Sequence, residues 1–459
     1  MADQASFRAL FETLVETNTV LGVGSCTIAA GKVSAAMIAA GFPPGDIHPY
    51  AAPGHPAEGG IVAVLHGGDR AAEAVLFVAH IDTVPASRED WKSDPFILTE
   101  EKGVFHGRGV SDNKAMAAAL ADGLVGLHAE GIRLRRSIGI ALTCGEETAT
   151  ALNGSEYLAT TRRDLLDAAL GHIGLVLIPS GGGLSDPAGR KVSLAIQVGE
   201  KIQQNFRIEA NGVATHSSRP APGNAIYILA EALARLQQHS FPVTLNPATR
   251  MYFDATAKTA PPADAKAIRS LLADPADAAA QTVVTANTAW NAMARTTCTA
   301  TVLESGLQLN TVGPRAAANV NCRLLPGARV ADVQATLETV VGASVPGSGV
   351  AGAGRLRVFA VPPLAKATPS PPITRDVLDP IAAVAAQMWP GVPIVPTMLT
   401  GATDARHFNA AGMAAYGVTA FFYDADGNGV HAPDERAGVA AVYEGREFIY
   451  RLMKRYAAR

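Results

Sequence analysis

Short, uninterrupted apolar runs alternate with helical patterns in the first part of the chain. Runs of this kind are typical of strands that are buried on both faces. Three of them lie at residues 75–79, 138–142 and 175–178. Apolar side chains at i, i+3, i+4 and i+7 predict one helix near residues 7–15 and another at 116–127. The alternation of such strands with helices predicts an α/β layer with a mainly parallel sheet.

Near residue 190 the pattern changes to strands in which apolar and polar side chains alternate, interspersed with amphipathic helices. Strands with one buried face, combined with such helices, indicate a small α+β sandwich. Residues 240–295 are rich in alanine and predict helical insertions. The predicted strands lie at 193–197, 205–210, 297–303, 317–324 and 356–360, and the helices at 226–236 and 330–340.

Five prolines between residues 362 and 372 mark a linker, because proline fixes φ and cannot donate a ladder hydrogen bond. The α/β character returns after this segment. We therefore expect one α/β domain, formed by residues 1–190 and 371–459, which is interrupted by a smaller α+β domain at residues 191–370.

Composition and charge exclude several classes of protein. Hydrophobic residues make up 48% of the 459 residues and charged residues 17%, so the chain is not intrinsically disordered. Lys and Arg number 38 against 41 Asp and Glu, and a net charge of -3 leaves no basic footprint for nucleic acid or for a membrane surface. No apolar run reaches the ~18 residues of a membrane helix.

The beginning of the sequence bears on the compartment. The first twenty residues carry charges and lack the apolar segment of a secretory signal. As written, the sequence predicts a cytoplasmic protein, and a periplasmic protein whose signal peptide has been removed is the alternative.

The four cysteines form no CxxC pair, which argues against a thiolate zinc site and against a redox motif. We expect buried, inert thiols. The main alternative is a disulfide between Cys298 and Cys322, because both lie in strand-like segments that are able to pair.

Polar side chains follow the buried runs, and the carboxyl ends of parallel strands are where α/β proteins place their chemistry. The first run ends in His80, and the carboxylate of Asp82 can hold the imidazole while it binds a metal. Asp112 stands just before the second helix, where a plain helix cap is the alternative. Glu146 and Glu147 follow the second run, and adjacent carboxylates at a strand end are costly unless a cation compensates them. A solvated glutamate pair is the alternative there.

Three further segments carry candidate residues. In Gly-rich turns near the end of the chain, Arg406 can grip a carboxylate through two hydrogen bonds and His431 can bind a metal. His216 precedes the first amphipathic helix of the inserted domain, where a structural histidine is the alternative. The sequence has no G-x-S-x-G elbow and no H-E-x-x-H helix, which argues against a serine hydrolase of that type and against a zincin.

In this order and spacing, the segments resemble the zinc-dependent metallopeptidase family of glutamate carboxypeptidase, aminoacylase, acetylornithine deacetylase and succinyl-diaminopimelate desuccinylase. The resemblance runs from residue 79 to residue 435. It implies a zinc-peptidase-like catalytic domain with a mainly parallel sheet, interrupted by a smaller α+β lid and dimerisation domain. The matching segments are AHIDTVP, WKSDPF, GRGVSDNKA, CGEET, GVATHSSRP, NVNCRLLPG, TGATDARHF and GNGVHAPDE.

The resemblance implies a metal role for five residues. His80 resembles a ligand of one zinc ion, with Asp82 as the partner that holds its ring. Asp112 resembles a carboxylate that bridges two metals, and Glu147 and His431 resemble ligands of the other metal. In such sites two metals ~3.5–4 Å apart clamp a water molecule and polarise the scissile carbonyl.

Four other residues resemble groups that act on the substrate. Glu146 resembles the general base that deprotonates the water, and His216 a lid histidine that holds the oxyanion, often across a dimer. Arg406 resembles the residue that grips the substrate's carboxylate, and Asn310 a polar lid contact. The resemblance thus implies a homodimer, with one or two zinc ions per chain, that hydrolyses an amide bond in a small peptide or N-acyl amino acid bearing a free carboxylate.

One position departs from the family's pattern. After the third buried run the family places a Glu or Asp that binds the same zinc as His80, and here Ser180 stands in its place, with Asp186 beyond three glycines as a poor substitute. A neutral hydroxyl is a weak zinc ligand beside a carboxylate, so we expect the His80 site to hold its metal weakly. The alternative function is a family member with an altered metal site, which binds a peptide or acyl-amino acid or runs metal-poor, non-hydrolytic amide chemistry.

Overall fold

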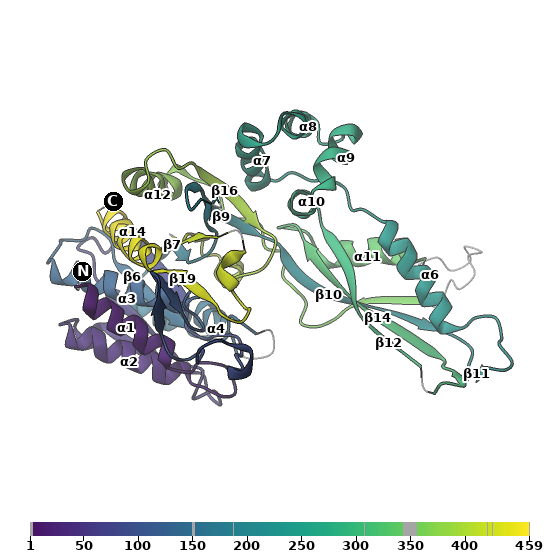
Figure 1. The fold of residues 1–459 in the computed structure, drawn as a ribbon, viewed down its shortest axis with the longest axis horizontal. Helices are drawn as coiled ribbons and strands as arrows, with labels where there is room; N and C mark the ends of the chain where they lie inside the picture. Colours follow the sequence, from purple (N-terminus) through teal and green to yellow (C-terminus); the bar gives the residue numbers. More distant parts are fainter. Residues whose placement is uncertain are drawn as a thin grey trace. The chain divides into compact units, whose positions relative to one another are not determined.

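The computed structural model describes residues 3–148, 152–186, 188–306, 308–342, 356–419, 421–424 and 426–458 (Figure 1). The chain divides into two compact units. Unit 1 comprises residues 1–198, 371–397 and 403–459, and unit 2 comprises residues 199–370 and 398–402. Strands β9 (Lys191–Glu200) and β16 (Ile394–Leu399) each run across a boundary between the units.

A ten-stranded mixed sheet forms the centre of unit 1, in the order β1-β2-β6-β3-β7-β17-β9-β8-β18 with β16 paired to β9. The neighbours β6, β3, β7 and β17 are parallel, whereas the β1–β2, β2–β6, β17–β9 and β8–β9 pairs are antiparallel. The α/β class expected from the sequence is therefore confirmed, in a sheet that is mixed rather than mainly parallel, and the three apolar runs are β3, β6 and β7. The bounds are β1 (Ile47–Tyr50), β2 (Gly60–Leu65), β3 (Ala74–His80), β6 (Ile138–Thr143), β7 (Ile173–Ile178), β8 (Gly182–Ser185), β17 (Ala415–Gly417) and β18 (Phe422–Tyr423).

Helices cover both faces of this sheet. On one face, α3 (Lys114–Ala129) packs on β3 and β6, and α1 (Gln4–Glu16), α2 (Cys26–Ala39) and α14 (Val439–Ala457) pack around α3. The predicted stripe of α3 is only part of its buried surface, because these neighbours bury residues 114–127 on every side. On the other face lie α4 (Gly154–Thr160), α5 (Arg163–Leu170) and α13 (Ala405–Ala410), and α12 (Arg375–Met388) packs on α14.

Smaller elements complete unit 1. A three-stranded sheet has the order β19-β5-β4, formed by β4 (Thr99–Glu101), β5 (Val104–His106) and β19 (Arg436–Gly438). The short 3-10 helices in the described residues of this unit are η1 (Pro44–Asp46), η2 (Arg88–Asp90) and η3 (Gly427–Gly429). In the part of the chain that the structure describes, no helix combines the length and the apolar character needed to cross a bilayer.

Unit 2 is built on an antiparallel sheet in the order β12-β14-β10-β15, with α6 and α11 packed against its apolar face (Figure 1). A separate two-stranded ribbon pairs β11 with β13. Helices α7 to α10 pack successively on one another and form the expected insertion. The bounds are β10 (Ile202–Asn211), β11 (Thr215–His216), β12 (Thr297–Ser305), β13 (Thr311–Val312), β14 (Arg315–Leu324), β15 (Leu356–Ala360), α6 (Ala225–Gln238), α7 (Pro247–Thr259), α8 (Pro262–Ala273), α9 (Ala278–Ala286), α10 (Thr288–Ala294) and α11 (Val330–Val341).

The cysteines correct the sequence analysis. The expectation of inert thiols is wrong, because all four cysteines form disulfides. Cys298 and Cys322 stand opposite each other in the β12–β14 register, with their Cα atoms 4.1 Å apart, which confirms the alternative pairing. The second disulfide was not expected: Cys26 begins α2 and Cys144 follows β6, and their Cα atoms lie 6.0 Å apart.

Candidate metal centre

Four side chains that are distant in the sequence meet in unit 1. Ligand atoms of His80, Asp112 and Glu147 all lie within 4.8 Å of one another. His80 Nε2 is 3.0 Å from Asp112 Oδ1. His431 Nε2 is 2.9 Å from Glu147 Oε2 and 3.4 Å from Asp112 Oδ2. The four residues expected to bind metal are thus brought together.

The parallel sheet accounts for this convergence. His80 is the last residue of β3 and pairs in register with Thr143, the last residue of β6. The turn that carries Glu146 and Glu147 begins just beyond Thr143, so it leaves the sheet at the same edge as His80. Asp112 reaches this edge from the turn that precedes α3, the helix packed on these two strands.

Asp82 lies behind His80 and connects it to the Glu147 turn. The backbone carbonyl of Asp82 is 3.2 Å from His80 Nδ1, and its carboxylate oxygen Oδ1 is 3.6 Å from the same nitrogen. The Asp82 Oδ2 atom accepts a hydrogen bond of 3.1 Å from the backbone N–H of Glu147. Asp82 is fully buried. It therefore restrains the imidazole and one carboxylate at once.

The two imidazoles and the Asp112 carboxylate stabilise each other's charged forms. Hydrogen bonds to Asp112 and Glu147 raise the pKa of His431 to about 10. Burial alone would lower the pKa of His80, but hydrogen bonds to Asp112 and Asp82 raise it well above its ordinary value. Burial alone would raise the pKa of Asp112, but hydrogen bonds from the two histidines hold it below its usual range.

This donor set fits a divalent cation. Imidazole nitrogen and carboxylate oxygen are the ligands of catalytic zinc sites, which take three protein ligands and leave one position open. Metal ligands must be deprotonated, so a bound dication would replace the protons that the two imidazoles now share with the carboxylates. His80, Asp112, Glu147 and His431 are the residues that would hold such an ion.

Glu146 stands beside the centre with an unusual acidity. Burial raises the pKa of its carboxyl to about 8, and the negative charges of Asp404, Glu147 and Asp112 act in the same direction, while His80 opposes them. A carboxylate with a pKa near neutrality is suited to take up and release a proton during a reaction.

The structure shows the surroundings of Ser180. The β3–β7 pairing ends at Phe77 and Leu177, so His80 and Ser180 each lie three residues beyond its end. The Ser180 hydroxyl donates a hydrogen bond of 2.5 Å to Gln197 Oε1. Asp186 is engaged in its own turn, where its carboxylate accepts from Arg190 Nε at 2.7 Å. Within the described residues, the cluster around His80 includes no carboxylate from this segment.

The expected substrate-binding residues lie in both units. Arg406 is on α13 of unit 1, where its Nε donates a hydrogen bond of 3.1 Å to His407 Nε2. His216 is exposed on β11 of unit 2, and its Nδ1 is 2.7 Å from the Ser218 hydroxyl. Asn310 is close to it, because the backbone N–H of Ser217 donates to the Asn310 carbonyl at 3.0 Å. The structure thus brings His216 and Asn310 together within unit 2.

Sequence analysis missed a buried ion pair behind Asp112. The Glu435 carboxylate accepts hydrogen bonds from Arg108 Nη1 (2.8 Å) and from the backbone N–H groups of Gly109 (2.9 Å), Ser111 (2.8 Å) and Asp112 (3.0 Å). It fastens the turn of Asp112 to the segment that carries His431. Arg108 and Glu435 both lie in segments that resemble the family. Their opposite charges are the feature of these segments that could have suggested an ion pair.

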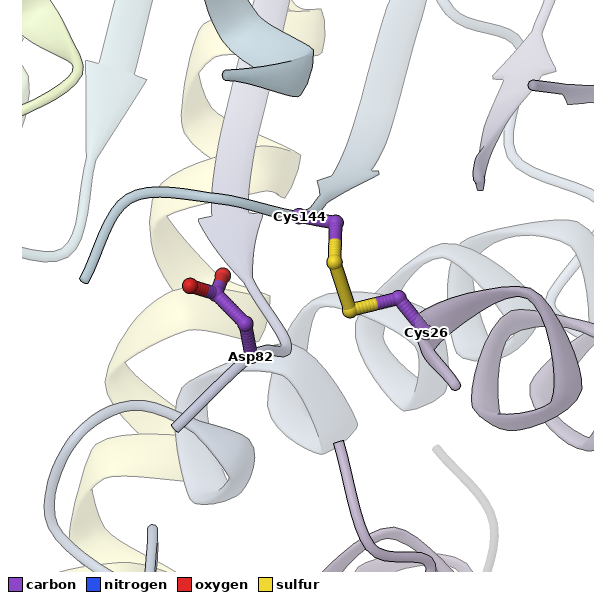
Figure 2. A group of neighbouring side chains, drawn as sticks. All are labelled: Cys26, Asp82 and Cys144. Atoms are coloured by element: carbon purple, nitrogen blue, oxygen red, sulfur yellow. A yellow bond between two sulfur atoms is a disulfide. The ribbon is translucent and has the colours of Figure 1, made fainter. Parts of the chain in front are cut away.

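A disulfide adjoins the centre on the side of Asp82. Figure 2 shows the Asp82 carboxylate beside the bond between Cys26 and Cys144, and ligand atoms of the three side chains lie within 4.8 Å of one another. Because the two sulfur atoms are bonded to each other, they are not thiolate ligands. The disulfide instead ties the start of α2 to the strand end that precedes Glu146.

Two imidazoles and three carboxylates at the carboxyl ends of parallel strands within a mixed sheet are typical of metal-dependent hydrolases. Residues 76–455 match the model of the peptidase family M20/M25/M40. The chain belongs to this family, which confirms the resemblance found in the sequence.

Individual relatives are more distant. The chain is 29% identical over 282 residues to the human N-fatty-acyl-amino acid synthase/hydrolase PM20D1, covering 60% of this chain and 54% of that protein. It thus spans about half the length of this relative. The fold is similar to that of the M20 family metallo-carboxypeptidase Sso-CP2 from Sulfolobus solfataricus (TM-score 0.69, 18% identity, 100% of both chains). It is also similar to that of the Bacillus subtilis YXEP protein, a dinuclear metal binding peptidase (TM-score 0.60, 13% identity, 98% of both chains).

Proposed function

We propose that this protein is a zinc-dependent enzyme that hydrolyses an amide bond in a small peptide or N-acyl amino acid bearing a free carboxylate. The observation that carries the proposal is the convergence of His80, Asp112, Glu147 and His431 beside Glu146. The human relative's name refers to N-fatty-acyl-amino acids, which favours N-acyl amino acids within this class.

Each residue has a distinct part in the proposed reaction. When bound, the zinc supplies Lewis-acid polarisation of the scissile carbonyl and of the attacking water. Glu146 accepts the proton of that water and delivers it to the leaving nitrogen. Arg406 binds the substrate's carboxylate through its planar guanidinium. His216 stabilises the oxyanion, and Asn310 contacts the substrate.

A second function is favoured by one observation. Ser180 offers a hydroxyl, already bonded to Gln197, where a second metal would need an anionic ligand. Such a site would hold one metal firmly and the other weakly. A family member of this kind binds a peptide or acyl-amino acid, or runs non-hydrolytic amide chemistry.

The decisive experiment compares the zinc-loaded protein with its Glu146→Gln variant on a panel of dipeptides and N-acyl amino acids. We expect hydrolysis by the native enzyme and a kcat lower by roughly 10²–10⁴-fold in Glu146→Gln, with unchanged zinc content. Arg406→Lys keeps the charge but loses the planar fork, so it should raise KM for free carboxylates and not for amidated analogues. A native enzyme that cleaves no member of the panel while fully loaded would overturn the hydrolase proposal in favour of the second function.

We also propose that the protein is a homodimer joined through unit 2. Strand β12 is an edge strand, and residues 299–305 are exposed on both of its faces, including Val302 (51%) and Leu303 (67%). An edge of this kind pairs readily with another strand. Light scattering should give twice the chain mass, and Val302→Lys with Leu303→Lys should give the monomer. Activity recovered on mixing inactive His216→Ala with inactive Glu146→Gln would place His216 in the partner's site.

We infer an oxidising compartment for the mature protein, such as the periplasm. Two disulfides support this inference, because cytoplasmic thiols are kept reduced by glutathione and thioredoxin. Thiol titration of the protein purified from its native source, with and without a reductant, tests it.

A further inference from the structure

Asp404 is a buried carboxylate of unit 1 held by neutral donors. It is 2% exposed. It accepts hydrogen bonds from Ser155 Oγ (2.6 Å), Asn153 Nδ2 (2.7 Å) and Thr143 Oγ1 (3.4 Å). Among the described residues, no Lys, Arg or His nitrogen forms an ion pair with it. Burying a carboxylate without a cation is costly, so each of these donors matters to its stability.

The three donors enclose the segment that carries the candidate catalytic glutamates. Thr143 ends β6 on one side of the turn of Glu146 and Glu147, while Asn153 caps α4 and Ser155 lies in its first turn on the other side. Asn153 reinforces this closure, because its Nδ2 also donates to the carbonyl of Gly145 at 3.2 Å. Asp404 therefore joins the two ends of the turn.

Asp404 comes from a segment about 250 residues further along the chain than these donors. It directly precedes α13, and Arg406 lies two residues beyond it. The Asp404 carboxylate thus contacts residues at both ends of the turn that carries Glu146 and Glu147. Asp404 also directly precedes the helix that carries Arg406. Hydrogen bonds to a charged acceptor are about twice as strong as neutral ones, which suits the carboxylate to hold two separate segments.

We propose that Asp404 is a positioning residue that fixes the turn of Glu146 and Glu147 and the helix of Arg406 relative to each other. The proposed base Glu146, the candidate metal ligand Glu147 and the carboxylate-binding Arg406 are then held in a fixed arrangement. The parts of this proposal that concern Glu146 and Arg406 rest on the proposed function. The effect of Asp404 on the position of Glu147 can be measured through metal affinity alone.

The conservative variant Asp404→Asn tests this proposal. Its amide oxygen can still accept from Asn153, and its amide nitrogen can donate to the Ser155 hydroxyl, so the fold should persist while the charge is lost. We expect zinc affinity, measured by competition with a chromogenic chelator, to fall about 10-fold or more, the loss that follows when groups that orient metal ligands are removed. We expect kcat to fall 10–100-fold, and KM to rise for substrates with a free carboxylate but not for their amidated analogues.

Two further variants separate positioning from plain stability. Asp122→Asn removes another buried carboxylate of unit 1, whose partner is Arg446 at 2.8 Å, and it should lower the melting temperature without changing zinc affinity or the ratio of KM values. Ser155→Ala removes one donor, and its effect on zinc affinity should be smaller and not additive with that of Asp404→Asn.

The outcomes distinguish this proposal from the proposed function. Zinc affinity and KM ratio equal to wild type in Asp404→Asn, or changes no larger than those of Asp122→Asn, would overturn the positioning role. If the native enzyme cleaves no substrate, the hydrolase proposal fails, and a lowered zinc affinity in Asp404→Asn but not in Asp122→Asn still supports the hold on Glu147.

Discussion

Replacing Glu435 by glutamine should destabilise unit 1 by about 3–5 kcal/mol, the usual cost of removing one partner of a buried ion pair. Glu435 is 1% exposed and Arg108 is 3% exposed. Burial raises the pKa of Glu435, while the donors from Gly109, Ser111 and Asp112 and the charge of Arg108 act against this rise. The net value of an intact buried pair is small, because desolvation offsets the attraction of the charges. The loss arises because the substitution leaves Arg108 charged and without its anion.

The hydrogen bonds of Glu435 show which donors would lose their acceptor in the glutamine variant. One carboxylate oxygen accepts from Arg108 and Gly109, and the other accepts from Ser111 and Asp112. Glutamine retains a single oxygen, so its NH₂ group must face one pair of donors. Each unsatisfied buried donor costs ~1–3 kcal/mol. These costs overlap with that of the ion pair and do not simply add to it.

The assay is urea unfolding followed by circular dichroism and by tryptophan fluorescence. The Trp91 ring centroid lies 4.9 Å from the Arg108 guanidinium, so one of the three tryptophans reports on this site. Zinc affinity should also fall, because the backbone of Asp112 loses a fixed acceptor. The double variant with Arg108→Met should recover part of the lost stability, since it removes the stranded charge. A Glu435→Gln variant within 1 kcal/mol of wild type, or a double variant less stable than the single one, would refute this reasoning.

Two predictions concern other parts of the chain. Ser180→Glu should raise the number of zinc ions retained after dialysis against a mild chelator from fewer than two towards two per chain, and two tightly held ions in the unmodified protein would contradict our interpretation of Ser180. Burial, with the positive charge of Arg323, lowers the pKa of Lys201 from 10.5 to about 7. The unfolded chain then binds more protons between these values, so stability rises with pH across this window, and Lys201→Met should be more stable than wild type at pH 7 by about 2–5 kcal/mol. The difference should vanish above pH 10.5, and thermal melts that show the same gain at both ends of the window would count against it.

Much of unit 1 could be predicted because its strands are continuous apolar runs that end in polar residues. β3 and β6 were identified in this way, and the residues that follow them proved to be neighbours. β2 has a similar run, but a short apolar run does not by itself distinguish a strand from a buried helix. Helix α2 is apolar around most of its circumference and therefore lacks the one-sided pattern of α1.

The candidate site was predictable only as far as its motifs were recognisable. The ligands follow from the order of the matching segments. Glu435 and Asp404 could not be assigned, because their partners lie 323 to 327 and 249 to 261 residues away and only the folded chain brings them together. Cys298 and Cys322 could be paired from their strands, whereas nothing in the sequence around Cys26 indicates Cys144. The structure brings the candidate metal ligands together, but the roles of all the candidate site residues, Glu146, Arg406, Ser180, His216 and Asn310 among them, remain predictions.

The disulfide between Cys26 and Cys144 has a consequence for the denatured protein. The bond closes a covalent ring across a sequence separation of 118 residues, and His80 and Asp112 both lie inside that ring. In the chain-entropy estimate, closing a ring of this size raises the free energy of the unfolded state by about 5 kcal/mol. The two candidate ligands therefore stay within one closed loop after heat has melted the sheet. A thermally denatured chain that is still oxidised should thus refold and bind metal on cooling more readily than a reduced one, because the bond limits the conformations that the unfolded chain must search.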